Sequence, residues 1–423
     1  MKKNRLISLD VFRGFTILAM TIVNNPGSWQ HIYAPLEHSK WNGCTPTDLI
    51  FPFFIFIMGT AIPFAMQNKQ FDSVIFNKIV VRSLRIFCLG LFLNCFRKIE
   101  FFDFEGIPLL IVRLTITAIV GYALLGNFSR KVKTFFAFGI LSVLFLLAYS
   151  KIESYQSLRI PGVLQRIGIV YFFTSILFLK TRLKTQIFIA TSLLLIYWFL
   201  MSCIPVPNFG APNFEKGTNL GAWLDNYILN GHMWRFSVTW DPQGILSTLP
   251  AIATGIIGMI IGQLLNLEIT KTEIIKKLIV IGISLVATGL LWNLVFPINK
   301  SLWSSSYVLY TGGLATLILT LLYYLIEIAH YKKWTKFFLI WGINPMIVFF
   351  LSGIVPRAWI MIEIQNPELA SDKLNSKEYF YNYGIAPLFS NPLNASLAFA
   401  LLYVLFWTVI LWFFYKKKMV FKV

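Results

Sequence analysis

One polar loop between two apolar stretches carries most of the side chains that could move protons. The loop, residues 24–47, contains Asn24, His38 and Trp41, and Asp48 follows it directly. Imidazole titrates near neutral pH and can serve as a general base or as an acyl-accepting nucleophile, so His38 is the strongest catalytic candidate. Asp48 or Asn24 could orient the ring through its other nitrogen. A loop histidine without a catalytic role is the competing interpretation.

The residues that flank this loop predict that its polar groups lie close together. The apolar run 6–23 ends at Asn24-Asn25-Pro26-Gly27, which is a strong helix stop. Thr45-Pro46-Thr47-Asp48 combines a capping side chain with an early proline, as helix starts do. Two helices joined by such a loop are expected to be neighbours, which would bring Asn24, His38 and Asp48 together.

The composition is that of an integral membrane protein. Hydrophobic residues make up 57% of the chain and charged residues 13%, with a mean hydropathy of +0.69; soluble domains are about one-quarter charged. The net charge of +19 does not indicate nucleic-acid binding, because the Lys and Arg residues fall in short clusters between apolar runs. The four cysteines have neither metal-binding nor disulfide spacing, so no metal site is expected; Cys44 remains an alternative nucleophile.

The apolar runs predict an all-α, polytopic membrane helix bundle with about twelve transmembrane helices in a single transmembrane acyltransferase domain, residues 1–423. The N-terminal run carries Asp10 and Arg13 and no small-residue cleavage site, so we expect a retained first span. The expected spans are 6–23, 48–66, 79–96, 107–125, 134–149, 162–179, 186–204, 245–265, 275–296, 307–328, 337–355 and 393–415.

The distribution of charge predicts the orientation. Most of the 37 Lys and Arg residues lie on the side that begins with Lys2, Lys3 and Arg5, which places both termini in the cytoplasm. Residues 24–47, 205–244 and 356–392 would then be outward loops. The second of these contains Trp240 and Asp241, types that stack on sugars and hydrogen-bond to them, although an interfacial aromatic belt explains the tryptophans equally well.

Several long segments occur in an order that matches a known family: RLISLDVFRGFTIL, HSKWNGCTPTDLIFPFFIFIMG, RIPGVLQRIGIVYF, DPQGIL and NKSLWSSSYVL. Together they resemble heparan-α-glucosaminide N-acetyltransferase and its bacterial relatives. The resemblance implies that cytoplasmic acetyl-CoA donates its acetyl group to the amine of a terminal glucosamine on the opposite side. It places the active-site histidine at His38 and matches Asn24 and Asp48. The hairpin 107–149 is additional, and in a bacterial envelope another amino sugar is an open alternative for the acceptor.

These observations give the hypothesis of an acyltransferase in a bacterial inner (cytoplasmic) membrane. The thioester arm of acetyl-CoA would enter a tunnel from the cytoplasm while its nucleotide stays behind. His38 would act as base or form an acetyl-histidine, Asp48 would hold its tautomer, and Asn24 would donate to the oxyanion. The expected substrate-binding residues are Trp41, Asn42, Trp240 and Asp241, and the expected phosphate-binding residues are Arg13, Lys78, Arg82 and Arg85.

Each of these basic residues is equally well explained as ordinary cytoplasmic charge, and Asp10 and Arg13, three apart, would form an ion pair. The expected partners are acetyl-CoA, an outer amino sugar or glycan, the lipid bilayer and, as an open alternative, a second copy in a homodimer. The alternative function is an amino-sugar permease, which the outward histidine cluster and the absence of a visible internal repeat disfavour. A purely structural scaffold would leave the histidine cluster unexplained.

Overall fold

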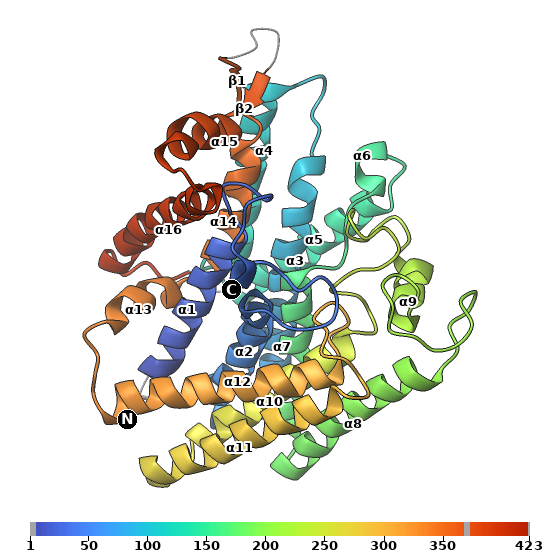
Figure 1. Cartoon of the computed structure of the whole chain (residues 1–423), viewed down its shortest axis with the longest axis vertical. Helices are drawn as coiled ribbons and strands as arrows, with labels where there is room; N and C mark the ends of the chain where they lie inside the picture. Colours follow the sequence, from blue (N-terminus) through green and yellow to red (C-terminus); the bar gives the residue numbers. More distant parts are fainter. Residues whose placement is uncertain (1–5, 368–372, 422–423) are drawn as a thin grey trace.

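The computed structural model describes residues 6–367 and 373–421, and almost all of its regular structure is helical (Figure 1). In this described part, ten helices are long and apolar enough to cross a membrane, and a bent helix pair qualifies as an eleventh span. The predicted all-α polytopic bundle is confirmed. The described residues thus contain ten or eleven candidate spans, against the predicted count of about twelve, and the 17-residue α1 is not among them.

The elements follow one another with short connections except around the loops named above. The main helices are α1 (Ile7–Val23), α2 (Ile50–Met66), α3 (Ser73–Cys95), α4 (Gly106–Leu125), α5 (Arg130–Ala148), α7 (Val163–Lys180), α8 (Leu183–Cys203), α10 (Thr248–Leu265), α11 (Lys271–Trp292), α12 (Ser305–Tyr323), α13 (Thr335–Ile343), α14 (Pro345–Trp359) and α16 (Pro392–Lys416). The shorter elements are α6 (Glu153–Gln156), α9 (Leu220–Leu229), α15 (Ser376–Tyr379) and the antiparallel strands β1 (Glu363–Gln365) and β2 (Lys373–Asn375).

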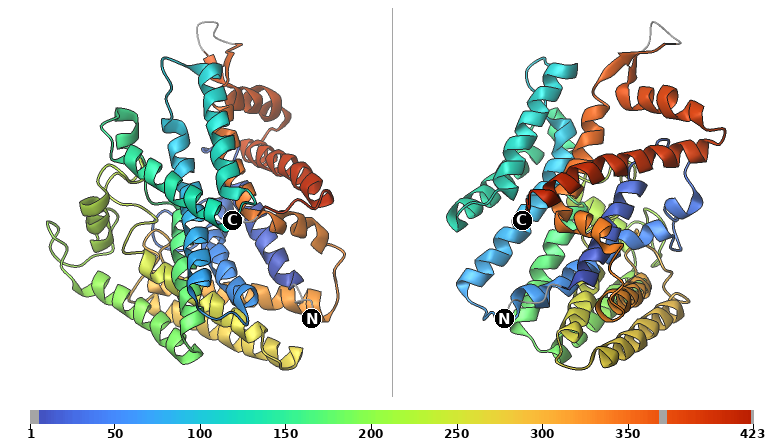
Figure 2. Two further views of the ribbon diagram at one scale, coloured as in Figure 1. Left: turned by 180° about the vertical axis from the view of Figure 1, so that it is seen from behind. Right: turned by 90° about the vertical axis from the view of Figure 1, so that its left-hand side faces the viewer.

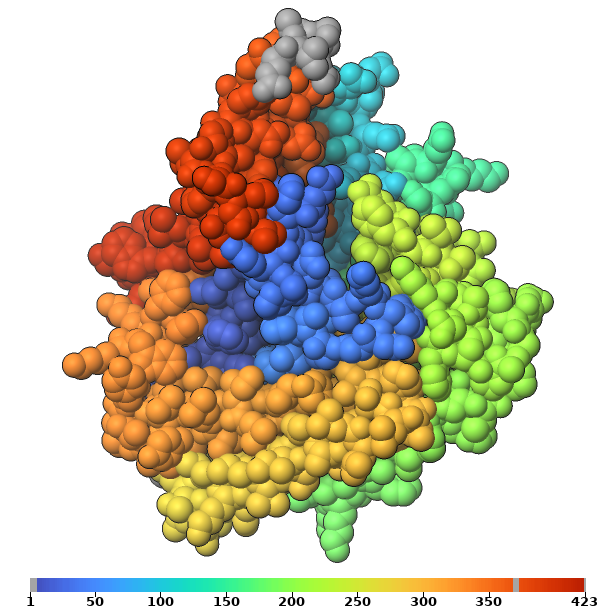
Figure 3. All heavy atoms as spheres, viewed as in Figure 1, coloured from blue at the N-terminus to red at the C-terminus, as the bar shows by residue number. Residues whose placement is uncertain are grey.

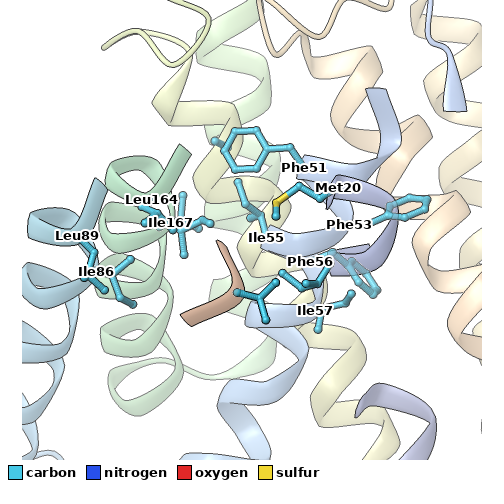
Figure 4. Packing of buried hydrophobic residues seen from close by; sticks show 14 of the residues in the cluster. Met20, Phe51, Phe53, Ile55, Phe56, Ile57, Ile86, Leu89, Leu164 and Ile167 are labelled. Atoms are coloured by element: carbon cyan, nitrogen blue, oxygen red, sulfur yellow. The ribbon is translucent and has the colours of Figure 1, made fainter. Parts of the chain in front are cut away.

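Helix α2 lies in the middle of the bundle, between α1, α7, α10 and α12 (Figures 1 and 2). Its apolar side chains pack in the main core with those of α3 and α7, as Figure 4 shows for Phe53, Ile55, Ile86 and Ile167. Because its hydrophobic residues run round most of its circumference, α2 is buried on nearly all sides, as expected for a helix without a polar face.

Glycines bring α2 and α10 into backbone contact. A Cβ atom on Gly59 would lie 2.1 Å from the carbonyl oxygen of Gly255, and one on Gly258 would lie 2.1 Å from that of Phe56. Small residues at such positions let membrane helices approach closely. By the helical period, Phe56 and Gly59 lie opposite the face that carries Phe54 and Ala61, so α10 fixes one side of α2 and leaves the other available.

The structure corrects the predicted eleventh span, residues 337–355. The chain instead forms α13 and α14, which meet at an angle of 77°. Pro345 begins α14 and cannot donate the backbone hydrogen bond that would continue α13. The side chain of Asn344 at the break donates to the carbonyl oxygen of Met419 (2.9 Å) and accepts from the backbone N–H of Phe421 (2.9 Å), which ties the C-terminal segment to the bend.

The described residues within 356–392 contain more regular structure than an irregular loop would. They include the end of α14, the β1–β2 hairpin, α15 and two further helical turns, Phe380–Ile385 and Ala386–Leu388. The cluster Lys2, Lys3 and Arg5, on which the orientation partly rests, lies outside the described residues. The assignment of cytoplasmic termini therefore stays a prediction.

The α2–α10 contact gives a stability prediction. Gly59→Ala should destabilise the protein by about 1–3 kcal/mol, because the new methyl group meets backbone that has no space to move. Thermal unfolding in detergent would measure this. Gly139→Ala on α5 is the matched control, since nothing lies within 4 Å of the Cβ position there and alanine is the better helix former. Equal melting temperatures for the two variants would contradict the close contact.

Candidate active site

The predicted loop residues meet around a cavity of about 450 Å³, here called the outer cavity. Asn24, His38, Trp41, Asp48 and Trp240 all line it. In the space-filling view, the 24–47 loop (blue) lies between the 205–244 segment (lime green) and the segment around residue 300 (gold) (Figure 3). Three stretches far apart in the sequence therefore build one site, and Asn24, His38 and Asp48 are brought together as the flanking helix signals predict.

His38 and Asp48 form a direct pair. The Nδ1 atom of His38 lies 2.8 Å from Oδ1 of Asp48, while the other carboxylate oxygen accepts from the backbone N–H groups of Ser39 (3.0 Å) and Thr45 (3.0 Å) and from the Thr45 hydroxyl (3.1 Å). Asp48 also completes a capping box with Thr45 at the start of the turn that leads into α2. The Asp48 side chain is 1% exposed and that of His38 is 55% exposed, so a fixed carboxylate orients an accessible imidazole.

Lys300 is a third member of this group that the sequence reasoning missed. Its Nζ atom lies 3.3 Å from Oδ1 of Asp48, 2.8 Å from Nδ1 of His38 and 3.2 Å from Nε2. Burial lowers the pKa of the Lys300 ammonium, and the neighbouring Asp48 carboxylate opposes that shift. Lys300 therefore offers a positive charge, or a hydrogen-bond donor, directly beside the imidazole.

The loop that carries Lys300 is held against the 24–47 loop by backbone and side-chain bonds. The N–H of Gly43 donates to the carbonyl oxygen of Ile298 (2.7 Å), and the Asn299 side chain donates to Oδ1 of Asn42 (3.1 Å). Asn42, expected to bind substrate, does not line the outer cavity. In this structure it positions the loop that delivers Lys300.

Asn24 follows α1 as its C-cap residue, and its exposed side chain faces the outer cavity. No other described residue hydrogen-bonds to its amide, which leaves both N–H groups available to a ligand. Cys44, the alternative nucleophile, behaves differently. Burial raises the pKa of its thiol to about 12, so the thiol stays protonated and a poor nucleophile at neutral pH. Within the described ranges, no three His, Cys, Asp or Glu side chains gather as metal ligands.

Two tryptophans form one wall of the outer cavity. The ring of Trp41 packs edge-on against Trp240, with centroids 5.3 Å apart, and its indole N–H donates to the carbonyl oxygen of Phe214 (3.0 Å). Both rings are therefore fixed by neighbours while they line the cavity. Rigid aromatic faces of this kind are surfaces on which a sugar ring can pack.

Asp241, expected to contact a sugar, is instead buried in an ion pair. Arg159 donates to both of its carboxylate oxygens (2.7 and 2.6 Å) and to Gln243 (2.6 Å), while the N–H of Trp234 also donates to Asp241 (2.9 Å). Asp241 is 2% exposed and does not line the outer cavity, whereas Arg159, Trp234 and Gln243 do. Asp241 therefore positions the residues that a ligand would meet.

Two further buried charged residues, Asp225 and Arg166, hold residues 241–247 in place. Asp225 on α9 accepts from the backbone N–H groups of Asp241 (3.2 Å) and Ile245 (2.8 Å). The guanidinium of Arg166 on α7 donates to the carbonyl oxygen of Gly244 (3.1 Å) and to the Ser247 hydroxyl (2.5 Å). Burial raises the pKa of Asp225 to about 6, although the two backbone donors oppose that shift. The conformation of residues 241–247 thus depends on groups from α7 and α9.

The basic residues predicted to bind phosphate line two further cavities. The inner cavity, of about 590 Å³, is lined by Arg13 and Arg82, and Arg13 pairs with Asp10 (2.8 Å) as expected. The basic pocket, of about 340 Å³, is lined by Lys78, Arg82 and Arg85. The sequence reasoning did not include the remaining cations of the basic pocket, Lys69 from the α2–α3 connection and Arg130 and Lys133 from α5.

One face of α2 runs along all three cavities. Phe54 lines both the outer and the inner cavity, and Ala65 and Met66 line both the inner cavity and the basic pocket. Ile50 and Ala65, the ends of this face, are about 22 Å apart at 1.5 Å per residue. The His38–Asp48 pair and the basic pocket therefore lie at opposite ends of a row of adjoining cavities.

Comparisons with known proteins agree with this arrangement of motifs. The chain is 27% identical over 480 residues to mouse (Mus musculus) heparan-alpha-glucosaminide N-acetyltransferase, an alignment that covers 99% of the chain and 61% of the mouse protein. It is also 27% identical over 399 residues to the human (Homo sapiens) protein of the same name, covering 82% of the chain and 52% of the human protein. The chain is thus similar to heparan-alpha-glucosaminide N-acetyltransferases over most of its own length. It spans between one half and about six-tenths of the length of these two relatives.

A family model also matches residues 5–205, with the description "Domain of unknown function (DUF5009)". That range contains α1, the 24–47 loop, α2, α7 and the segment before α7 that carries Arg159, and it includes His38, Asp48 and much of the lining of the cavities. Lys300, Trp240 and Gln243 lie beyond it. The match therefore covers the His38–Asp48 pair, while other residues that line the outer cavity come from the second half of the chain.

The raised pKa of Asp225 gives a pH-dependent stability prediction. Its folded-state value of about 6 lies above the ordinary 3.8, so the folded protein binds the proton more tightly and this contribution to stability falls as pH rises from about 4 to about 6. The apparent melting temperature should therefore be higher at pH 5 than at pH 7, with at most about 3 kcal/mol from this group. Asp225→Asn should reduce that difference; an unchanged difference in the variant would contradict the assignment.

Proposed function

We propose that the chain is a transmembrane acetyltransferase that moves the acetyl group of acetyl-CoA to the amine of an extracytoplasmic amino sugar, with His38 as the general base. One observation carries the proposal. An accessible imidazole fixed by a buried carboxylate lies at one end of a row of cavities, and a pocket lined by six Lys and Arg side chains lies at the other. The names of the two relatives support the same chemistry.

The basic pocket suits the nucleotide of acetyl-CoA. Its phosphates would be held by charge-assisted hydrogen bonds from residues such as Lys78, Arg85 and Arg130. The inner cavity, lined largely by Met58, Ala61 and other apolar side chains, would take the pantetheine arm. We place this end at the cytoplasmic face of a bacterial inner membrane, because its clusters of Lys and Arg are typical of that side.

The outer cavity suits the acceptor sugar. Trp41 and Trp240 offer apolar faces for the ring, and Arg159 and Gln243 offer hydrogen-bonding groups held in place by Asp241. A sugar bound there would lie beside His38 and Lys300. Pockets that combine aromatic walls with a few fixed polar groups are the usual form of small-ligand sites.

The chemistry follows from the His38–Asp48 geometry. Asp48 accepts a hydrogen bond from Nδ1–H, so Nε2 would take the proton from the attacking amine once the amine displaces Lys300, whose Nζ atom lies 3.2 Å from Nε2. The amine nitrogen bonds to the thioester carbonyl carbon, the carbon–sulfur bond breaks, and the proton passes from His38 to the CoA thiolate. Asn24 and Lys300 line the same cavity and would stabilise the oxyanion. The products are an N-acetylated sugar and free CoA.

The first test is acetyl transfer by the purified protein from acetyl-CoA to glucosamine or a short amino-sugar oligomer. His38→Ala should lower transfer by at least ~10²-fold, as loss of a positioned base does, and should leave stability and acetyl-CoA affinity nearly unchanged because the side chain is half exposed. His31→Ala is the matched control: His31 belongs to the same loop but does not line the outer cavity.

Several outcomes would redirect this proposal. Full activity in His38→Ala would remove the central residue. Radiolabel retained on the protein without acceptor, and lost in His38→Ala, would replace direct attack with an acetyl-histidine intermediate. Uptake of unmodified sugar into proteoliposomes, without any need for acetyl-CoA, would favour the permease.

The donor site gives a separate prediction. The double variant Arg130→Ala, Lys133→Ala should raise the KM for acetyl-CoA at least ~10-fold, since each charge-assisted hydrogen bond contributes about 1.5–3 kcal/mol, and should leave the KM for acetyl-pantetheine unchanged because that donor lacks the nucleotide. Lys131→Ala is the control, because Lys131 lies between the two on α5 and does not line the basic pocket. An equal effect on both donors would argue against phosphate binding in this pocket.

A further inference from the structure

We propose that Phe54 is the constriction through which the acyl group must pass, so that it selects narrow acyl groups and closes the route when no arm is present. This inference rests on the proposed acetyl transfer for its selective part, while closure can be tested without it. Neither the pattern of motifs nor the comparisons assign a role to Phe54.

The cavity boundaries identify this residue. Among the residues that the structure describes, the outer and inner cavities have one lining residue in common, and it is Phe54. Its side chain is half-buried, whereas Phe53 and Ile55 on either side of it are buried in the core. On the same face of α2, Ile50 lines the outer cavity alone and Met58 lines the inner cavity alone. The aromatic ring thus belongs to the boundary between two spaces that are otherwise lined by different residues.

Three other helices also line both cavities, each with different residues in the inner and the outer one. On α1, Arg13 lines the inner cavity and Thr16 the outer one. On α7 the change falls between Ile167 and Val163. On α14, Met346 lines the inner cavity and Phe349 the outer one. The four helices therefore contribute to the lining of both cavities, and Phe54 is the described side chain that belongs to both linings.

The position of Phe54 on α2 makes it suited to act as a closure. The opposite side of α2 is held against α10 by the glycine contacts, so the backbone cannot move away to widen the path. Passage then requires rotation of the side chain itself. A linear arm that ends in an acetyl group has about the cross-section of its own chain, whereas a branched acyl group is wider than the arm behind it. Selection should therefore depend on acyl width more than on acyl length.

Acyl donors of different width test selection. Wild-type protein should transfer acetyl and propionyl groups and discriminate against isobutyryl, by the ~10- to 200-fold typical of steric exclusion of a small alkyl group. Phe54→Ala should raise the isobutyryl-to-acetyl ratio of kcat/KM at least ~10-fold, and Phe54→Leu should raise it less. Met58→Ala is the matched control, because it enlarges the inner cavity and leaves the shared position intact. An unchanged ratio in Phe54→Ala would overturn selection by Phe54.

Proton permeability of proteoliposomes tests closure without any acyl donor. Phe54→Ala should let an imposed pH gradient decay faster than wild type or Met58→Ala does, at equal amounts of folded protein. Decay at the wild-type rate would overturn closure by Phe54. If wild-type protein transfers no acyl group while Phe54→Ala still leaks protons, closure by Phe54 stands and the proposed transferase function fails. If wild-type protein transfers acetyl normally while Phe54→Ala neither leaks nor changes selectivity, the transferase function stands and the proposed role of Phe54 fails.

Discussion

The burial of the Asp48 carboxylate is the constraint on which the site depends. A charged group removed from water is costly unless it is paired and hydrogen-bonded, and the side chain of Asp48 is 1% exposed. Its oxygens are satisfied by Ser39, Thr45, His38 and Lys300. Its own backbone carbonyl accepts from the hydroxyl of Tyr307 on α12 (2.5 Å). These requirements fold the 24–47 loop back onto the start of α2 and draw in the loop before α12.

The same carboxylate links local structure to chemistry. As the third residue of the capping box, Asp48 stabilises the first turn of the segment that becomes α2. As the partner of His38, it fixes which ring nitrogen faces the outer cavity. Because one group serves both purposes, the start of the membrane helix fixes the position of the buried Asp48 carboxylate. Through that carboxylate it also fixes the position of the accessible His38 imidazole. Helix α2 continues from this point, and one of its faces lines all three cavities.

The sequence predicted those features that depend on neighbouring residues. Apolar runs of membrane length gave the fold class, and the Thr45-Pro46 start and the Asn24 stop placed His38, Asn24 and Asp48 together. Contacts between distant segments could not be read in the same way. Lys300, from the second half of the chain, lies beside His38. Asp241 is expected from the sequence to contact a sugar, whereas it is buried in an ion pair with Arg159.

The departures in the fold have the same origin. A hydropathy pattern continues through Asn344-Pro345, so residues 337–355 read as one span, although proline ends one helix and the Asn344 side chain binds the C-terminal segment. Asn42 belongs to the WNG sequence that follows closely after His38 and is predicted from the sequence to bind substrate, whereas its amide oxygen accepts from the Asn299 side chain. In each case a hydrogen bond to a distant partner decides the outcome, and a single sequence does not contain that information.

The distribution of polarity along α2 explains how one chain could let an acyl group cross and retain its charged carrier. The basic pocket is lined by cations and the outer cavity by the His38–Asp48–Lys300 group, while Phe54, Met58 and Ala61 between them are apolar. Transfer of a charged group past the apolar residues of this α2 face is costly, but an uncharged thioester arm does not meet that penalty, although Arg13 and Arg82 also line the inner cavity. In the proposed reaction, electrostatics at the basic pocket would hold the nucleotide back, and the neutral acetyl group would reach His38 at the other end.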